Sequence, residues 1–114
     1  MKIENLFETL PGPSDREQIR CLLETGEVRI EQIISHAQPS PEGFCYDQPN
    51  AEWVLLLKGS ATLLLAPKET VELKAGDSLL IPAHLRHRVE RTSEDAIWLA
   101  VHFQNTLTPR TPPE

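Results

Sequence analysis

Cysteine and aromatic residues are scarce in this sequence, and basic residues are fewer than acidic ones. Its two cysteines, Cys21 and Cys45, lack the spacing of a metal-binding pair, and the alternation of Ile19, Cys21 and Leu23 predicts that Cys21 is a small buried hydrophobe. The 114 residues include 11 Lys and Arg against 17 Asp and Glu, for a net charge of -6. Because phosphate binding depends on clustered Lys and Arg, nucleic acid is not expected as a partner.

Long hydrophobic runs are also missing. No run approaches the roughly 20 apolar residues of a membrane span. The first ten residues, MKIENLFETL, carry acids where a signal peptide has a basic region and an apolar stretch. The chain also lacks a Gly-rich phosphate loop, a G-x-S-x-G elbow and a CxxC pair. We therefore expect a soluble, cytoplasmic, single-domain protein with no membrane partner and with none of those three chemistries.

Short alternating runs of apolar and polar residues do recur, separated by Gly, Pro and Asp turns. Residues 19–23 and 28–36 alternate on either side of a Gly-containing turn, which predicts a β-hairpin. A helix over 15–24 stays open as an alternative, because DREQIRCLLE would also cap and propagate a helix. Further strand-like runs span 52–57, 60–66, 71–73, 78–81, 87–91 and 96–103. This pattern predicts an all-β sandwich or barrel.

The predicted domain organisation has three parts. Residues 1–27 form an N-terminal extension with the first strand of the hairpin, residues 28–104 form the barrel, and residues 105–114 form a flexible tail.

Two spacings in the barrel region carry a family resemblance. Glu52 and Gly59 are separated by six residues, and Gly76 and Pro82 by five, with His87 following. These spacings resemble the cupin motifs G-x5-H-x-H-x3,4-E-x6-G and G-x5-P-x-G-x2-H-x3-N over roughly residues 28–103. The resemblance implies an all-β double-stranded β-helix, or jelly-roll, barrel that commonly forms homodimers. Trp53 and Trp98 are candidates for the dimer surface.

The resemblance also implies a site with a divalent transition metal, namely Fe, Mn, Ni or Zn. The two histidines of the first motif fall on Tyr46 and Gln48, or on Cys45 and Asp47 if the gap is one residue longer. Neither pair contains a histidine, so Glu52 and His87 are what remains of the usual ligand set. Amide and phenol oxygens bind late divalent metals more weakly than imidazole does.

The resulting assignments cover three roles. Gln48, Glu52 and His87 are the predicted metal ligands, and Tyr46 and Glu52 are the predicted catalytic residues. Gln32 has the same parity as Ile30 and Ile34, which predicts that it faces inward. The predicted ligand-binding residues are Gln32, His36, Tyr46 and His102, although the position of His102 between Val101 and Phe103 equally fits a buried core histidine.

Two functions fit these residues. One is a metal-dependent enzyme acting on a small, carboxylate-bearing molecule, which Arg86, Arg88 or Arg91 could hold if one of them reached the barrel mouth. The other is a metal-free module that binds or senses a small molecule. His84 is expected at the rim, on the surface.

Overall fold

The structure, a computed structural model, describes residues 1–8, 12, 17–37 and 45–104. Within these residues the regular elements are eight strands, with no helix. They are β1 (Gln18–Glu24), β2 (Val28–Ile34), β3 (Ala51–Lys58), β4 (Ser60–Leu65), β5 (Glu69–Lys74), β6 (Ser78–Ile81), β7 (His87–Thr92) and β8 (Ile97–Phe103). The predicted all-β class is confirmed, and from Gln18 onward the first run is a strand rather than the alternative helix. The predicted tail, residues 105–114, and residues 15 and 16 of the alternative helix lie outside the described residues.

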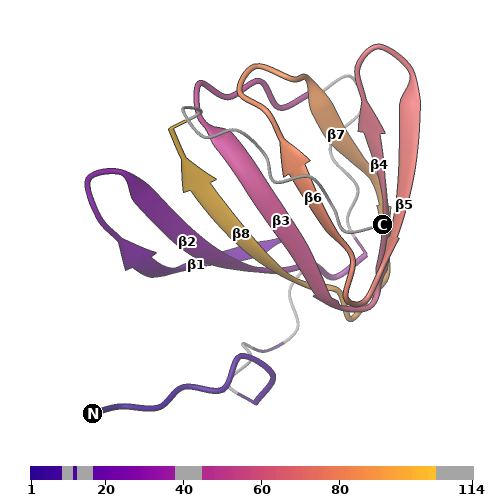
Figure 1. Cartoon of the computed structure of the whole chain (residues 1–114). Coiled ribbons are helices and arrows are strands. Elements are labelled where there is room, and N and C mark those ends of the chain that lie inside the picture. Colours follow the sequence, from indigo (N-terminus) through magenta and orange to yellow (C-terminus); the bar gives the residue numbers. More distant parts are fainter. Residues whose placement is uncertain (9–11, 13–16, 38–44, 105–114) are drawn as a thin grey trace, which may run out of the picture.

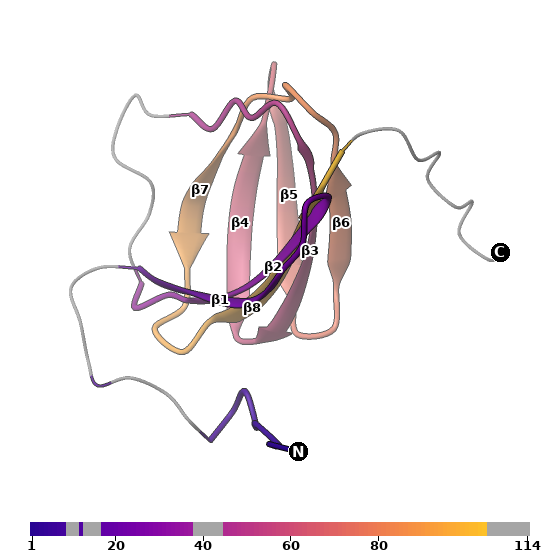
Figure 2. The same cartoon turned by 90° about the vertical axis from the view of Figure 1, so that its left-hand side faces the viewer.

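The strands form two facing antiparallel sheets, as the predicted jelly-roll barrel requires (Figure 1). The larger sheet has the order β1-β2-β8-β3-β6, and the smaller one has the order β5-β4-β7. Figure 2 shows the smaller sheet behind β8 and the β1–β2 hairpin, which extends past one edge of the barrel in Figure 1. No helix among the described residues is long and apolar enough to cross a membrane.

The core lies between the two sheets because alternate residues of each strand point inward. In β4, for example, Ala61, Leu63 and Leu65 are buried while the residues between them are only half-buried. Burial of such apolar surface is the main favourable term in folding. The central cluster consists of Val54, Leu56, Ala61, Leu63, Leu73, Ile81, Ala96, Trp98 and Ala100.

Two expectations about burial are wrong. Trp98 is only 5% exposed and belongs to the core cluster, so it cannot form part of a dimer surface. Cys21 is exposed, because β1 is the edge strand of its sheet and packs on β2 alone. Alternation correctly marked both segments as strands, but it does not show which face of a strand is covered.

The N-terminal segment covers the outer face of the hairpin. The Gln32 side-chain amide donates a hydrogen bond of 2.8 Å to the backbone carbonyl of Leu6. Arg20 forms an ion pair with Glu4 and donates a hydrogen bond of 2.7 Å to the Gln32 side chain. Gln32 is therefore completely buried, with its polar atoms satisfied by the N-terminal segment and β1.

Gly59 makes the tight turn between β3 and β4, which passes the chain from one sheet to the other. Its φ of +88° lies in the left-handed region, where a Cβ is disfavoured. A Cβ added there would also lie 2.9 Å from the Cα of Ala96. Gly76 has a similar φ of +95°, but a Cβ there would meet nothing within 4 Å.

We expect Gly59→Ala to destabilise the fold more than Gly76→Ala does. Both variants incur the left-handed penalty of about 1–2 kcal/mol, and only Gly59→Ala adds a steric clash with the β7–β8 turn. Urea unfolding at a common m-value measures the difference in the free energy of unfolding. Equal losses in the two variants would show that the backbone around Ala96 moves away at little cost.

Candidate functional site

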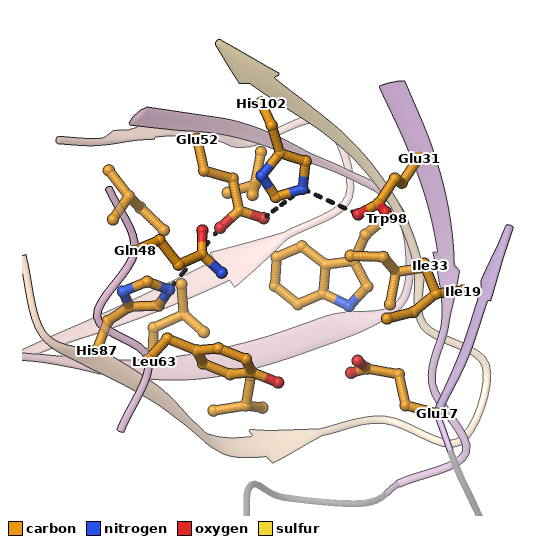
Figure 3. Close-up of a pocket in the computed structure, with 14 residues that line it drawn as sticks. Glu17, Ile19, Glu31, Ile33, Gln48, Glu52, Leu63, His87, Trp98 and His102 are labelled. Atoms are coloured by element: carbon orange, nitrogen blue, oxygen red, sulfur yellow. Dashed lines mark hydrogen bonds and ion pairs between the residues drawn. The ribbon is translucent and has the colours of Figure 1, made fainter. Parts of the chain in front are cut away.

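A pocket opens between the two sheets on the side of the β1–β2 hairpin. It encloses about 620 Å³ when the solvent in its open mouth is included. Its walls are formed by every strand except β5, together with the segments that precede β1 and β3 (Figure 3). The lining residues are Glu17, Ile19, Glu31, Ile33, Tyr46, Gln48, Glu52, Val54, Leu63, Ile81, His87, Val89, Trp98 and His102.

The segment that carries Tyr46 and Gln48 is fixed by backbone hydrogen bonds to the start of β7. The Tyr46 N–H donates to the His87 carbonyl at 2.6 Å, and the His87 N–H donates back to the Tyr46 carbonyl at 3.1 Å. The His84 N–H donates to the Gln48 carbonyl at 2.7 Å. The rings of Tyr46 and His87 stack with centroids 5.3 Å apart. These contacts bring the two positions of the first motif next to the histidine of the second.

His87 has a defined tautomer in its neutral form. Its Nδ1 lies 2.9 Å from the backbone carbonyl of Leu85. Because a carbonyl oxygen can only accept a hydrogen bond, Nδ1 carries the proton, and Nε2 therefore has a lone pair. Nε2 lies 3.8 Å from Oε1 of Glu52, which is too far for a direct hydrogen bond. A lone pair facing a carboxylate is favourable only when a proton or a cation lies between them.

His102 lies on the other side of the Glu52 carboxylate. β3 and β8 pair these two residues directly, and Nε2 of His102 is 3.8 Å from Oε2 of Glu52. The same nitrogen lies 2.9 Å from Oε1 of Glu31, whose second oxygen is 3.1 Å from Nε of Arg29. An ionised carboxylate only accepts, so Nε2 of His102 donates to Glu31 and is not available as a metal ligand.

Burial perturbs the ionisable groups that line the pocket. It raises the pKa of Glu52 above its ordinary value of 4.5, and His102 and His87 partly oppose that rise. Burial also raises the pKa of Glu17, and the negative charges of Glu52 and Glu31 add to the effect. The pKa of Tyr46 is raised above 10.0 by burial and then by Glu17 and Glu52, so its hydroxyl is protonated at neutral pH.

The structure brings together five of the seven predicted site residues. Tyr46, Gln48, Glu52, His87 and His102 all line the pocket. Figure 3 shows Gln48 and His87 pointing into the cavity near Glu52. Glu52 and His87, which are far apart in the sequence, therefore face each other in the pocket, and the roles of these residues remain predictions.

Gln32 and His36 lie outside the pocket. The inward parity predicted for Gln32 is wrong: Glu31 and Ile33 are the β2 residues that line the cavity, while Gln32 faces the N-terminal segment. His36 follows β2, and its Nε2 lies 2.8 Å from the Gln18 side chain. Both faces of β2 carry apolar residues, so hydrophobicity did not show which of them points inward.

The three arginines considered as anchors for an anionic substrate do not line the pocket. Arg86 and Arg91 are exposed, and Arg91 donates a hydrogen bond of 2.9 Å to the Ser60 hydroxyl. Nε of Arg88 lies 3.0 Å from Glu90. His84 is exposed, as expected for the rim, with Nδ1 at 2.9 Å from Asp47.

Sequence reasoning missed two acidic residues of the pocket, Glu17 and Glu31. Glu31 lies on the face of β2 opposite to that of Gln32, together with Ile33. Glu17 precedes the edge strand β1 and lines the cavity from the side of the hairpin (Figure 3). Glu31 and Ile33 are two residues apart and therefore share a face of β2, so an inward Ile33 would have predicted an inward Glu31. No local pattern identifies Glu17 as a pocket residue.

The donor set of the pocket fits a divalent metal through three residues. His87 presents the lone pair of Nε2 and has its other nitrogen fixed by a carbonyl, the usual arrangement of a metal-binding histidine. Glu52 adds a carboxylate, and Gln48 adds a weaker amide oxygen. Within the described ranges no group of three or more His, Cys, Asp or Glu side chains is placed to hold a metal ion. Such an ion would therefore need Gln48 and non-protein ligands to complete its coordination.

Comparison with known proteins agrees with the fold and the motif spacings. Residues 34–102 match the cupin domain family, and since this match covers more than half of the chain, the protein belongs to that family.

Relatives with names that describe enzymes match part of the chain. The 3-hydroxyanthranilate 3,4-dioxygenase of Paraburkholderia phytofirmans is 36% identical over 62 residues, which is 52% of this chain and 36% of the relative. The enzyme of the same name from Burkholderia cenocepacia is 37% identical over 62 residues, covering 52% of this chain and 35% of the relative. The match thus spans about a third of the length of these curated relatives.

Solved structures match almost the whole chain. A protein of Ralstonia eutropha described as a "putative mannose-6-phosphate isomerase" is 42% identical with a TM-score of 0.86, over 90% of this chain and 98% of that chain. An RmlC-like cupin protein of Desulfovibrio desulfuricans has a TM-score of 0.74 at 19% identity, over 90% and 96% of the two chains. The second likeness concerns the fold alone.

In metal-free protein, we expect Glu52→Gln to be more stable than wild type at about pH 8 and to lose that advantage below about pH 4.5. The folded protein holds the pKa of Glu52 above 4.5, so wild type loses stability as pH rises through the folded pKa, and a neutral amide does not. Unfolding free energies measured across this pH range test the expectation. Glu24→Gln makes the same substitution at an exposed position on β1 and is the control. An advantage that grows toward low pH would show that the ionised form of Glu52 is the stabilised one.

Proposed function

We propose that this cupin is an enzyme that holds a divalent transition metal through Gln48, Glu52 and His87 and acts on a small molecule in the pocket. The observation that carries the proposal is the lone pair of His87 Nε2, which faces the buried Glu52 carboxylate across 3.8 Å. A cation between these two groups would satisfy both. Such a metal would supply Lewis-acid polarisation of a bound oxygen atom.

The residues of the chain then have distinct roles. The Leu85 carbonyl orients His87, and the pairing of β3 with β8 fixes Glu52 beside His102. Tyr46 serves as a proton donor rather than as a phenolate ligand, because its hydroxyl stays protonated at neutral pH. Glu52, the other predicted catalytic residue, would be an ionised carboxylate when it binds the metal.

The names of the similar proteins support a small-molecule substrate. One describes a dioxygenase acting on 3-hydroxyanthranilate, and another an isomerase of mannose 6-phosphate. Their reactions differ, so the names support the size class of the substrate and not one reaction. The three arginines considered as binding groups for a carboxylate-bearing substrate lie outside the pocket, so they do not support such a substrate.

The proposal includes a soluble, cytoplasmic homodimer that binds neither nucleic acid nor membrane. Trp53 is the remaining aromatic candidate for the dimer surface. It is half-buried on β3 and has the parity opposite to Glu52 and Val54, which line the pocket. Its side chain therefore belongs to the outer face of the larger sheet.

A second candidate function is a metal-free binding or sensing module. The observation that favours it is the pairing of His102 Nε2 with Glu31. This pairing leaves only Glu52 and His87 as strong metal ligands directed at the same space among the described residues, which is few for a metal site. In that case Glu52 and His87 would act as hydrogen-bonding groups for an organic ligand.

Metal content distinguishes the two functions. We expect untagged wild-type protein, loaded with Mn, Fe, Ni or Zn and dialysed, to retain about one equivalent of metal, and Glu52→Gln and His87→Ala to retain much less. His84→Asn is the matched control, because it removes an exposed imidazole at a φ of 63° that asparagine tolerates. Wild type that retains no more metal than His87→Ala would rule out the metal-dependent function and leave the binding module.

A further inference from the structure

The charges that line the pocket are unequal. Three carboxylates line it, those of Glu17, Glu31 and Glu52, and none of the described lining residues is a lysine or arginine. Glu31 is neutralised, since Arg29 and His102 both lie within 3.1 Å of its oxygens. From the described residues, no ion pair or hydrogen bond reaches Glu17, and Glu52 has only the two imidazoles at 3.8 Å. The cavity therefore carries unmatched negative charge.

The unmatched negative charge of Glu17 and Glu52 is unfavourable in free energy because of where the two carboxylates lie. Glu52 is 8% exposed and its carboxylate is aimed into the cavity without a hydrogen-bond donor among the described residues. A buried anion without a partner is unfavourable, and the repulsion between Glu17 and Glu52 adds to the cost. An occupant with positive charge relieves both effects, whereas an anionic occupant increases them.

The two unmatched carboxylates lie apart in the pocket. In Figure 3, Glu52 lies beside His87 and His102, whereas Glu17 enters from the hairpin side, beyond the Trp98 ring. The space between them is lined by Trp98 and by apolar side chains such as Ile33 and Leu63. Aromatic faces attract cations, so the wall next to Glu17 suits an ammonium group on an apolar or aromatic body.

We infer that the pocket selects small organic amines, with Glu17 binding the ammonium group and the Trp98 wall contacting the apolar body. This inference rests on the proposed function, because it assigns the Glu52–His87 end to the metal and the Glu17 end to the substrate. It makes Glu17 a specificity-determining residue, and it replaces the carboxylate-bearing ligand expected from the arginines.

Three probes of nearly equal shape test the charge preference. Benzylamine is cationic at neutral pH, benzyl alcohol is neutral and benzoate is anionic. We expect benzylamine to bind about tenfold more tightly than benzyl alcohol in titrations followed by protein NMR, and benzoate to bind more weakly than both. Benzoate binding as tightly as benzylamine, or no advantage of benzylamine over benzyl alcohol, would overturn the inference.

Two variants with the same change of charge test whether Glu17 is the residue that binds the ammonium group. Glu17→Gln should weaken benzylamine binding about five- to tenfold and leave benzyl alcohol binding unchanged. Glu24→Gln makes the same charge change at an exposed position at the far end of β1, the strand that follows Glu17, and should alter neither. Equal effects of the two variants would overturn the role of Glu17.

The same titrations with metal-loaded and metal-stripped protein separate this inference from the proposed function. Glu17→Gln should retain as much metal as wild type. Loss of metal retention in wild type with the amine preference intact would contradict the metal proposal alone. Retained metal without an amine preference would contradict the inference alone.

Discussion

The carboxylate of Glu52 is buried inside a β barrel, and the arrangement of the pocket depends on how that charge is compensated. Burying an ionised carboxylate costs several kcal/mol unless close partners replace the lost water. Its ion-pair partners among the described residues are the Nε2 atoms of His87 and His102, both 3.8 Å away. Each imidazole also has a nearer partner, which is the Leu85 carbonyl for His87 and the Glu31 carboxylate for His102. The site therefore keeps a deficit of positive charge, and ionisable groups with such perturbed pKa values concentrate at functional sites.

The barrel can hold this unfavourable group because strand pairing fixes it from several sides. Glu52 lies directly opposite His102 in one strand pair and Ile81 in another. His87 begins β7 and is joined by two backbone hydrogen bonds to Tyr46. A side chain held by two neighbouring strands cannot turn to solvent without breaking the sheet. The free energy of packing in the core therefore offsets the unfavourable burial of the charge.

Membership of the cupin family explains the geometry of the pocket but does not determine its chemistry. Cupin-like barrels carry many activities, and here no histidine stands at the positions predicted for the first motif, where the pocket is lined by Tyr46 and Gln48. Both side chains are neutral at neutral pH. With Glu17 and Glu31 added from the hairpin side, the described lining has three carboxylates against two imidazoles and no Lys or Arg, and this balance is the basis of the inferred preference for cationic occupants.

The sequence by itself determined the strands and the turn at Gly59, because period-two alternation and turn residues are local properties. The pair of Glu52 and His87 followed from motif spacings that resemble those of cupins. It did not determine which face of β2 is inward, so Gln32 was placed in the pocket and Glu31 was not. Only the tertiary structure decided that the N-terminal segment covers Gln32, that Trp98 forms a pocket wall and that Glu17 reaches the cavity. Each of these depends on contacts between residues far apart in the chain, and no local pattern encodes which of two apolar faces another segment will cover.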